Sequence, residues 1–352
     1  MTDLYPLLIE PRFDERIWGG HRLADMGTGA PATTLVGEAW EVYAENRVRN
    51  GPYAGKTISD LQSLLGADLM GHIPPDRVFP LLTKLIDARE ALSVQVHPDN
   101  ALAQRLEHEP YGKTECWYII AAEPGAALTY GFERANSPEE YERLVQSGAL
   151  ETILHSLPVK PGDVVYIPAG TVHAIGAGIL LFELQQTSDT TYRIYDWGRV
   201  DAQGKPRQLH VDKASQVLDY HRETRGLIRP LAAPDGRRSM LVGAPYFTLE
   251  LDTRGGAFTT HDSPVALCTL DHPIEIRTGG QSVSLAAYAS ALIPAACGTY
   301  QIEGDGRVLT AYVPASSEVT RRELAAWGYS DREIDTYLAQ FAPAAGLGLA
   351  AS

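Results

Sequence analysis

The 352-residue chain contains no run of 18 uninterrupted apolar residues, so no segment of it predicts a membrane-spanning helix. Its first residues, MTDLYPLLIEPRFDE, include acids where a secretory signal has a basic start and an apolar run, so we expect no export. Cysteine is scarce. Cys116, Cys268 and Cys297 are odd in number and far apart, which predicts neither a disulfide framework nor a CxxC metal site. We therefore expect a protein of the reducing cytoplasm with no membrane partner.

Basic residues are in deficit. The chain has 30 Lys and Arg against 44 Asp and Glu, which gives a net charge of −14. A phosphate backbone is repelled by such a surface at long range, so we expect no nucleic-acid partner. A small phosphorylated substrate remains compatible with this charge, because a few local basic side chains can overrule the global sign.

Two common kinds of catalytic motif are also missing. The segment GAGILL over 176–181 is not a GxGxxG loop and follows no βαβ pattern, which argues against a nucleotide site. The chain shows no G-x-S-x-G motif and no cysteine nucleophile arrangement.

Short β-prone runs bounded by glycine and proline dominate the sequence. Examples are ALSVQVH, ECWYII, DVVYIP, ILLFELQQ and FTLELD, and the chain has 32 glycines and 23 prolines. This pattern favours an all-β barrel or sandwich over alternating strands and helices.

Helical signals are few. We expect helices from Thr57 or Ser59, over 100–107 after Asp99, and from Ser137, where Glu140 would close a capping box. Two further S/T-x-x-E boxes are Thr320 with Glu323 and Ser330 with Glu333. They predict a helical hairpin over 317–341. This hairpin would either cover an open end of the β structure or bind a partner.

A faint internal repeat suggests two related β units. The segment GDVVYIPAGTVHAIG over 162–176 is echoed by YASALIPAACGTYQIEG over 288–304, and the alignment places Thr299 opposite His173. The second copy would therefore lack the residue that could bind metal. We expect a metal-binding catalytic domain over 1–222 and a second, metal-free domain over 223–315. A helical C-terminal extension would follow over 316–352.

The run ALSVQVHPDN places three polar side chains on one face of an expected strand. By alternation Ser93, Gln95 and His97 point one way, while the leucine and valines between them point to the core. This is either a half-exposed strand that faces water or a donor set for a metal, since His beside Gln suits a borderline cation.

The run GKTECWYII places Lys113 and Glu115 on one face of a second strand. A carboxylate in so apolar a strand is costly unless a cation pairs with it. The alternatives are a surface ion pair between these two residues, or a metal-ligating Glu115 with a lysine in the same cavity.

The run GDVVYIPAGTVHAIGAG has a strand, a tight turn set by proline and glycine, and a returning strand that begins at His173. Alone, such a histidine is more often a core residue. With Gln95, His97 and Glu115 it forms a set of four donors that leaves coordination positions open, as catalytic sites do. The order and spacing of these donors are those of the cupin superfamily.

Longer motifs extend this likeness. LSVQVHPDN, GKTECWYII and IPAGTVHAIGAGILLFELQQTSDTTYRIYDWGR, together with RIWGG and GEAWEVYAE, resemble the short bacterial form of class I mannose-6-phosphate isomerase. The resemblance implies an all-β-dominated fold of two cupin-type (jelly-roll) β-barrels with a few peripheral helices. It implies a cytoplasmic, metal-dependent aldose–ketose isomerase that interconverts mannose 6-phosphate and fructose 6-phosphate through an enediol.

The same resemblance implies residue roles. One divalent ion, expected to be Zn2+, would be bound by Gln95, His97, Glu115 and His173. Arg193 would be essential and Lys113 a cavity lysine, both also contacting substrate. Further active-site positions, by match alone, are Ser93, Lys84 and Asp189.

The residues support the arginine independently. Extended geometry in SDTTYRIYDWGR places Asp189, Thr191 and Arg193 on one face. The pair Asp189–Arg193 could simply brace a loop, but beside a metal a guanidinium suits a phosphate or an enediolate. Lys84 is either a snorkelling surface lysine or a phosphate contact. The base that moves the proton could be Lys113, Asp189 or a water on the metal.

The sequence departs from the longer members of the family. Only 57 residues join Glu115 to His173, with no inserted helical domain, and Gly112 stands where those members have a histidine. The eight remaining histidines lack partners at ligand spacing and are expected to be ordinary surface or loop residues: His21, His72, His108, His155, His210, His221, His261 and His272.

Other functions remain open. Another cupin enzyme on a sugar phosphate, such as an epimerase or a glucose-6-phosphate isomerase, or a metal dioxygenase, would share the metal cluster. A non-catalytic sugar-binding bicupin would tolerate the loss of donors in both halves. We expect a monomer or a weak homodimer.

Overall fold

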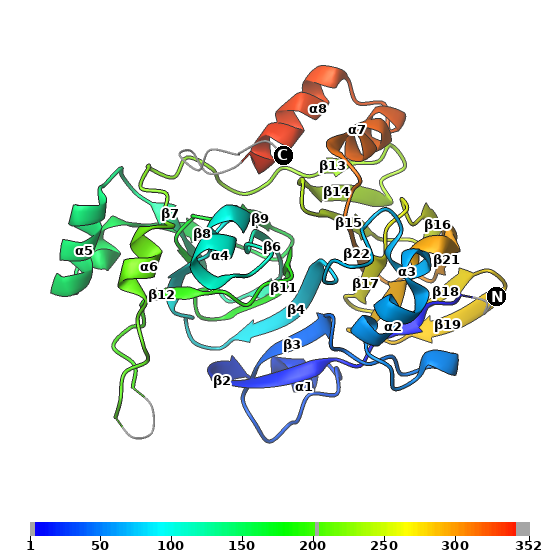
Figure 1. Ribbon diagram of the computed structural model, residues 1–352, viewed down its shortest axis with the longest axis horizontal. Helices are drawn as coiled ribbons and strands as arrows, with labels where there is room; N and C mark the ends of the chain where they lie inside the picture. Colours follow the sequence, from blue (N-terminus) through cyan, green and yellow to red (C-terminus); the bar gives the residue numbers. More distant parts are fainter. Residues whose placement is uncertain (1–3, 201–203, 343–352) are drawn as a thin grey trace.

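The computed structural model describes residues 4–200 and 204–342. Its strands form four sheets, in which neighbouring strands pair antiparallel. Two sheets belong to the first half of the chain and two mostly to the second, and they form two β bodies that lie side by side (Figure 1). The expected β-dominated architecture is therefore present.

The first body pairs a six-stranded sheet with a five-stranded sheet. In spatial order the six strands are β2 (Arg12–Gly20), β3 (Val36–Val42), β4 (Leu81–Ala88), β11 (Ile179–Gln186), β6 (Glu115–Ala122) and β9 (Val164–Ile167). The five strands are β12 (Tyr192–Tyr195), β5 (Val94–Val96), β10 (His173–Ala174), β7 (Ala127–Phe132) and β8 (Leu154–Pro158).

The second body pairs a seven-stranded sheet with a four-stranded sheet. The seven strands are β1 (Leu7–Leu8), β20 (Ser290–Ile293), β17 (Val265–Thr269), β22 (Val308–Tyr312), β15 (Thr248–Asp252), β14 (Arg238–Gly243) and β13 (Leu231–Ala232). The four strands are β16 (Gly256–Thr259), β21 (Thr299–Glu303), β18 (Ile274–Thr278) and β19 (Gln281–Leu285).

Strand β1 joins the second body although it comes from the start of the chain. Leu7 pairs with Leu292 and Leu8 with Ala291. The N-terminal segment expected in the first domain thus also completes the sheet of the second. The domain limits at 222 and 315 remain a prediction.

Short helices lie at the margins. The α-helices are α1 (Arg22–Asp25), α2 (Ile58–Leu65), α3 (Ala67–Met70), α4 (Asn100–Glu107), α5 (Pro138–Ser147), α6 (Val211–Ser215), α7 (Ser317–Ala326) and α8 (Asp331–Leu338). The 3-10 turns are η1 (Gly51–Tyr53), η2 (Leu150–Ile153), η3 (Ala295–Cys297) and η4 (Ala339–Phe341). None of these helices is long and apolar enough to cross a membrane.

Capping signals located the starts of four of these α-helices, α2, α4, α5 and α8. Thr57 caps α2 in a full capping box with Asp60, and Ser330 caps α8 with Glu333. Ser137 caps α5, but the side chain of Glu140 binds Arg134 at 2.7 Å and does not close a box. The reason is the opposite charge, which binds a carboxylate more strongly than a neutral backbone N–H does.

The box expected at Thr320 and Glu323 is wrong. Helix α7 already begins at Ser317, so both residues lie inside it. Thr320 is buried, and Glu323 instead forms an ion pair with Arg238 at 3.0 Å. The hairpin of α7 and α8 lies above the second body (Figure 1).

One large apolar cluster joins the two bodies. Tyr166 of β9 packs edge-on against Phe247 at 6.3 Å and against Phe341 at 5.3 Å. Phe341 follows α8, so the helical hairpin packs on both barrels. Separate clusters fill the inside of each body.

Candidate metal centre and substrate pocket

Three neighbouring strands of the five-stranded sheet bring predicted site residues into one row. Gln95 of β5 lies opposite His173 of β10 on one side and opposite Arg193 of β12 on the other. His97 follows β5 directly and, by strand alternation, lies on the same face as Gln95.

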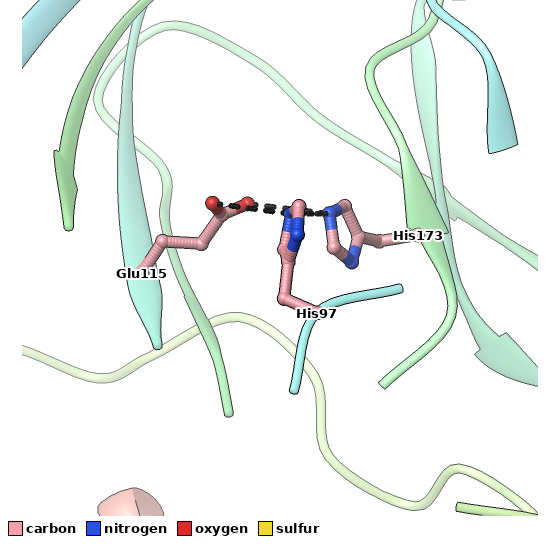
Figure 2. Close-up of side chains that lie close together, drawn as sticks. All are labelled: His97, Glu115 and His173. Atoms are coloured by element: carbon pink, nitrogen blue, oxygen red, sulfur yellow. Dashed lines mark hydrogen bonds and ion pairs between the residues drawn. The ribbon is translucent and has the colours of Figure 1, made fainter. Parts of the chain in front are cut away.

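Glu115 approaches this row from the other sheet, at the start of β6. Its Oε1 lies 3.3 Å from Nε2 of His173 and its Oε2 lies 3.6 Å from Nε2 of His97. The two imidazole Nε2 atoms are 3.1 Å apart. Figure 2 shows the carboxylate and the two rings pointing at one another.

The other ring nitrogens are held by the backbone. Nδ1 of His97 lies 2.9 Å from the carbonyl oxygen of Thr190, and Nδ1 of His173 lies 2.9 Å from that of Thr171. Each Nδ1 therefore donates a hydrogen bond, which leaves both Nε2 atoms as acceptors aimed at the same point. Such an orientation is typical of metal-binding histidines.

Burial keeps these imidazoles neutral. It is the main cause that lowers the pKa of His97 well below its ordinary value and that of His173 to about 4. Burial also raises the pKa of Glu115 to about 7. Neutral imidazoles are the form that binds metal.

The donor set fits one ion. Oε1 of Glu115 is buried without a hydrogen-bond partner among the described residues, which leaves a costly orphan unless a cation is present. The amide of Gln95 lies 3.3 Å from Nε2 of His173 and can offer its oxygen after an amide flip. Ligands about 2.0–2.1 Å from a tetrahedral ion lie about 3.3 Å apart, which matches the observed separations.

Next to these donors lies a pocket of about 450 Å3. It is lined by Lys84, Ser93, Gln95, Lys113, Asp189 and Arg193, so every predicted substrate-binding and catalytic residue reaches it. Lys113 links pocket and donors, because its Nζ lies 3.2 Å from Nε2 of His97 and contacts the Glu115 carboxylate.

Arg193 is not braced by Asp189. Within residues 4–200 and 204–342 no ion pair joins them; instead the Arg193 Nε donates to Oγ of Ser93 at 3.2 Å and Nη1 donates to the carbonyl of Gln208 at 3.1 Å. Burial and then the charge of Arg207 lower the pKa of Arg193. An anion in the pocket would relieve this crowding of positive charge.

Comparison with known proteins agrees with this geometry. Residues 7–119 match the family described as phosphomannose isomerase type I, catalytic domain. A mannose-6-phosphate isomerase of Streptococcus mutans is 38% identical over 315 residues, 87% of this chain and 98% of the relative. The mannose-6-phosphate isomerase ManA of Bacillus subtilis is also 38% identical, over 88% of this chain and 99% of its own length.

This chain belongs to the type I phosphomannose isomerase family. The crystal structure of the Bacillus subtilis mannose 6-phosphate isomerase superposes with a TM-score of 0.80 at 33% identity and covers 87% of this chain and 99% of that one. A mutant of the Salmonella typhimurium phosphomannose isomerase shares the fold, with a TM-score of 0.73 at 16% identity over 88% of this chain and 99% of that one. The predicted two-barrel cupin-type fold is confirmed.

The structure explains one departure from the longer phosphomannose isomerases. A Cβ at Gly112 would lie 2.4 Å from the backbone carbon of Asp99 and 2.5 Å from the carbonyl oxygen of Pro98. That carbonyl accepts from N–H of Lys113 at 3.0 Å. The position therefore has no room for a side chain, and it fixes Lys113 beside the loop that follows His97.

Four charged residues of the pocket were not predicted from the sequence: Arg16, Glu38, Glu183 and Arg207. Glu183 is the most buried of them, and its signal was a lone carboxylate inside the apolar run ILLFELQQ. Burial acts to raise the pKa of Glu183, but Lys113, Lys84 and the N–H of Trp117 outweigh it and lower that pKa to about 2.

Proposed function

We propose that this protein is a metal-dependent mannose-6-phosphate isomerase that interconverts mannose 6-phosphate and fructose 6-phosphate. The observation that carries the proposal is the buried donor set of His97, Glu115 and His173 beside a pocket whose lining includes five cationic side chains. A hexose phosphate needs both features, because it brings a carbonyl that must be polarised and an anion that must be bound.

We propose Gln95, His97, Glu115 and His173 as the ligands of a divalent ion, and Zn2+ as that ion. Two imidazoles, one carboxylate and one amide oxygen suit a borderline cation at tetrahedral separations. When bound, such an ion supplies Lewis-acid stabilisation of negative charge on the substrate oxygens.

The remaining residues of the pocket act on the sugar phosphate. Arg193, placed by Ser93, would bind the phosphate or the developing enediolate. Lys84 would bind an anionic group of the substrate through its own positive charge. The lysine keeps that charge because Glu183, 3.2 Å away, stabilises the protonated amine. Lys113 or Asp189 would act as the base that takes the proton from one sugar carbon and returns it to the next.

We further propose that the enzyme works in the cytoplasm as a monomer or a weak homodimer. Its three cysteines are free thiols, and Cys116 and Cys268 are buried. Unpaired, buried thiols suit a reducing compartment.

A coupled assay tests the function. Purified protein loaded with Zn2+ should convert mannose 6-phosphate, and a chelator should abolish turnover reversibly. Arg193→Ala should lower kcat/KM by about 100-fold or more, the scale for losing one electrostatic contact to the reacting charge. No chelator-sensitive turnover in folded, metal-loaded protein would contradict the proposal.

A further inference from the structure

A second group of metal-ligand side chains lies in the second barrel, outside the pocket. Glu250 comes from β15, His261 from the turn after β16, and Glu323 from α7. One ligand atom of each lies within 4.8 Å of the others. His261 was expected to be an ordinary loop residue, but its side chain is only 22% exposed and stacks on Tyr312 at 4.5 Å.

The group carries more negative than positive charge. The side chains of Glu250 and Glu323 are 5% and 11% exposed. Asp252 lies two residues beyond Glu250 on the same strand face and is also buried. The basic side chain that pairs with the two glutamates is Arg238, 3.0 Å from Glu323 and 3.8 Å from Glu250. Burial and the charge of Glu323 raise the pKa of Glu250 to about 8, so a further positive charge is needed to hold both glutamates ionised.

Two unpartnered oxygens lie on the sheet face that carries Glu250. Oδ2 of Asp252 and Oγ1 of Thr310 are buried without a hydrogen-bond partner among residues 4–200 and 204–342. Thr310 lies directly opposite Glu250 across β15 and β22, so both side chains share one face of the sheet. Buried oxygens of this kind are costly unless a ligand, a proton or water satisfies them.

Neighbouring contacts fix the orientation of these donors. Oε1 of Glu323 binds Arg238, while its Oε2 accepts from the Tyr312 hydroxyl at 3.4 Å and lies 3.9 Å from Nε2 of His261. Arg238 is itself clamped between the rings of Phe258 and Trp327, at 5.5 and 5.1 Å. A ligating carboxylate with one oxygen fixed by a cation keeps the other oriented toward the ion.

The turn that carries His261 is strained. His261 and Asp262 both have positive φ, 53° and 54°, which non-glycine residues seldom adopt. The N–H of His72, next to α3, holds this turn by donating to the Asp262 carbonyl at 2.9 Å. Backbone strain maintained by a partner from another element is typical of a constrained site.

We propose that Glu250, His261 and Glu323 form a second binding site, for a divalent transition-metal ion such as Zn2+, which ties helix α7 to the second barrel. One imidazole and two carboxylates suit such an ion. The second barrel, expected to be metal-free because Thr299 replaces the histidine of the first, binds metal here through different positions.

Metal counting tests the proposal. The full-length chain is stripped with chelator, saturated with Zn2+, desalted and analysed for metal. Wild type should hold two ions per chain, and Glu323→Gln and His261→Asn should each hold one. Asn suits the positive φ at His261 and is too short to replace its ring. The matched control is Glu318→Gln, an exposed residue of the same helix, which should keep two.

Two further measurements guard against misfolding. Glu323→Gln and His261→Asn should keep wild-type isomerase activity, because neither Glu323 nor His261 lines the pocket. Zn2+ added beyond the first equivalent should raise the Tm of wild type but not that of His261→Asn. One ion per wild-type chain at saturating Zn2+, or two ions in both variants, would overturn the proposal.

Discussion

Lys84 and Glu183 lie directly opposite each other across β4 and β11, with Lys84 Nζ 3.2 Å from Glu183 Oε1. Both side chains are buried, and the indole N–H of Trp117 donates to the other oxygen of Glu183 at 2.9 Å. Burial alone would lower the pKa of Lys84, but Glu183 outweighs it and raises that pKa. The pocket therefore contains a cation that stays charged because of a partner on the next strand.

Breaking this pair should destabilise the protein. Glu183→Gln leaves the Lys84 charge buried without its partner, so we expect the free energy of unfolding to fall by about 3–5 kcal/mol. Adding Lys84→Met should recover most of that loss, because an apolar side chain needs no counter-charge. Urea denaturation of the two single variants and the double variant measures this. Additive losses would show that the two residues do not interact.

Gly112→Ala should impair the site through the backbone. The new Cβ would lie 2.4 Å from Asp99, so the chain must move and take Lys113 away from His97. We expect kcat/KM to fall at least tenfold and Zn2+ affinity to weaken, measured by steady-state kinetics and competitive chelation. The control is Gly226→Ala, whose Cβ would meet no atom within 4 Å. Equal behaviour of the two variants would contradict this account.

Glu41 should make stability depend on pH. It is buried in β3, neither carboxylate oxygen has a hydrogen-bond partner among the described residues, and burial raises its pKa to about 7. The folded chain thus holds a proton that the unfolded chain releases above about pH 4.5. Wild type therefore loses stability relative to Glu41→Gln as pH rises from about 4.5 to 7, by about 3 kcal/mol in total.

Urea denaturation at several pH values measures this difference. The control is the exposed Gln146→Ala, which changes no ionisable group and should show a constant difference from wild type over the same range. A gap between wild type and Glu41→Gln that does not change with pH would mean that Glu41 is ionised in the folded state.

Ser93→Ala should act on the substrate through Arg193. The Ser93 hydroxyl accepts from Nε of Arg193 at 3.2 Å, and its loss frees the guanidinium to move. We expect kcat/KM to fall about three- to tenfold, the scale of one hydrogen bond of about 1 kcal/mol, with unchanged Zn2+ content. In a protein that already carries Arg193→Ala, adding Ser93→Ala should cause no further fall in kcat/KM. Ser147→Ala, on the exposed face of α5, is the control.

Local chemistry accounts for the shared strand face and the helix starts that the sequence predicts. Alternation along ALSVQVH put Ser93, Gln95 and His97 on one face, and the structure has them facing the pocket or the metal donors. Caps at Thr57 and Ser330 located two helices, because a side chain and a backbone N–H three residues on need nothing from the rest of the fold.

Long-range contacts account for the rest. Glu183 was missed because its partner Lys84 is far away in sequence, and only the register of β4 against β11 brings them together. Glu323 was misassigned to a helix cap, since nothing near it in sequence reveals Arg238 on β14. Gly112 could be noted as a departure, but the backbone that fills its side-chain space belongs to another loop.

The amino-acid sequence by itself determined which side chains share a strand face, where four of the helices begin and which family the chain resembles, because these depend on neighbours a few residues apart. The tertiary structure alone decided which faces meet. It set Gln95 between His173 and Arg193, turned the Nε2 atoms of two imidazoles toward one carboxylate, and brought α7 onto the second barrel. Sheet register and barrel closure decide such contacts, and both depend on the packing of the whole chain.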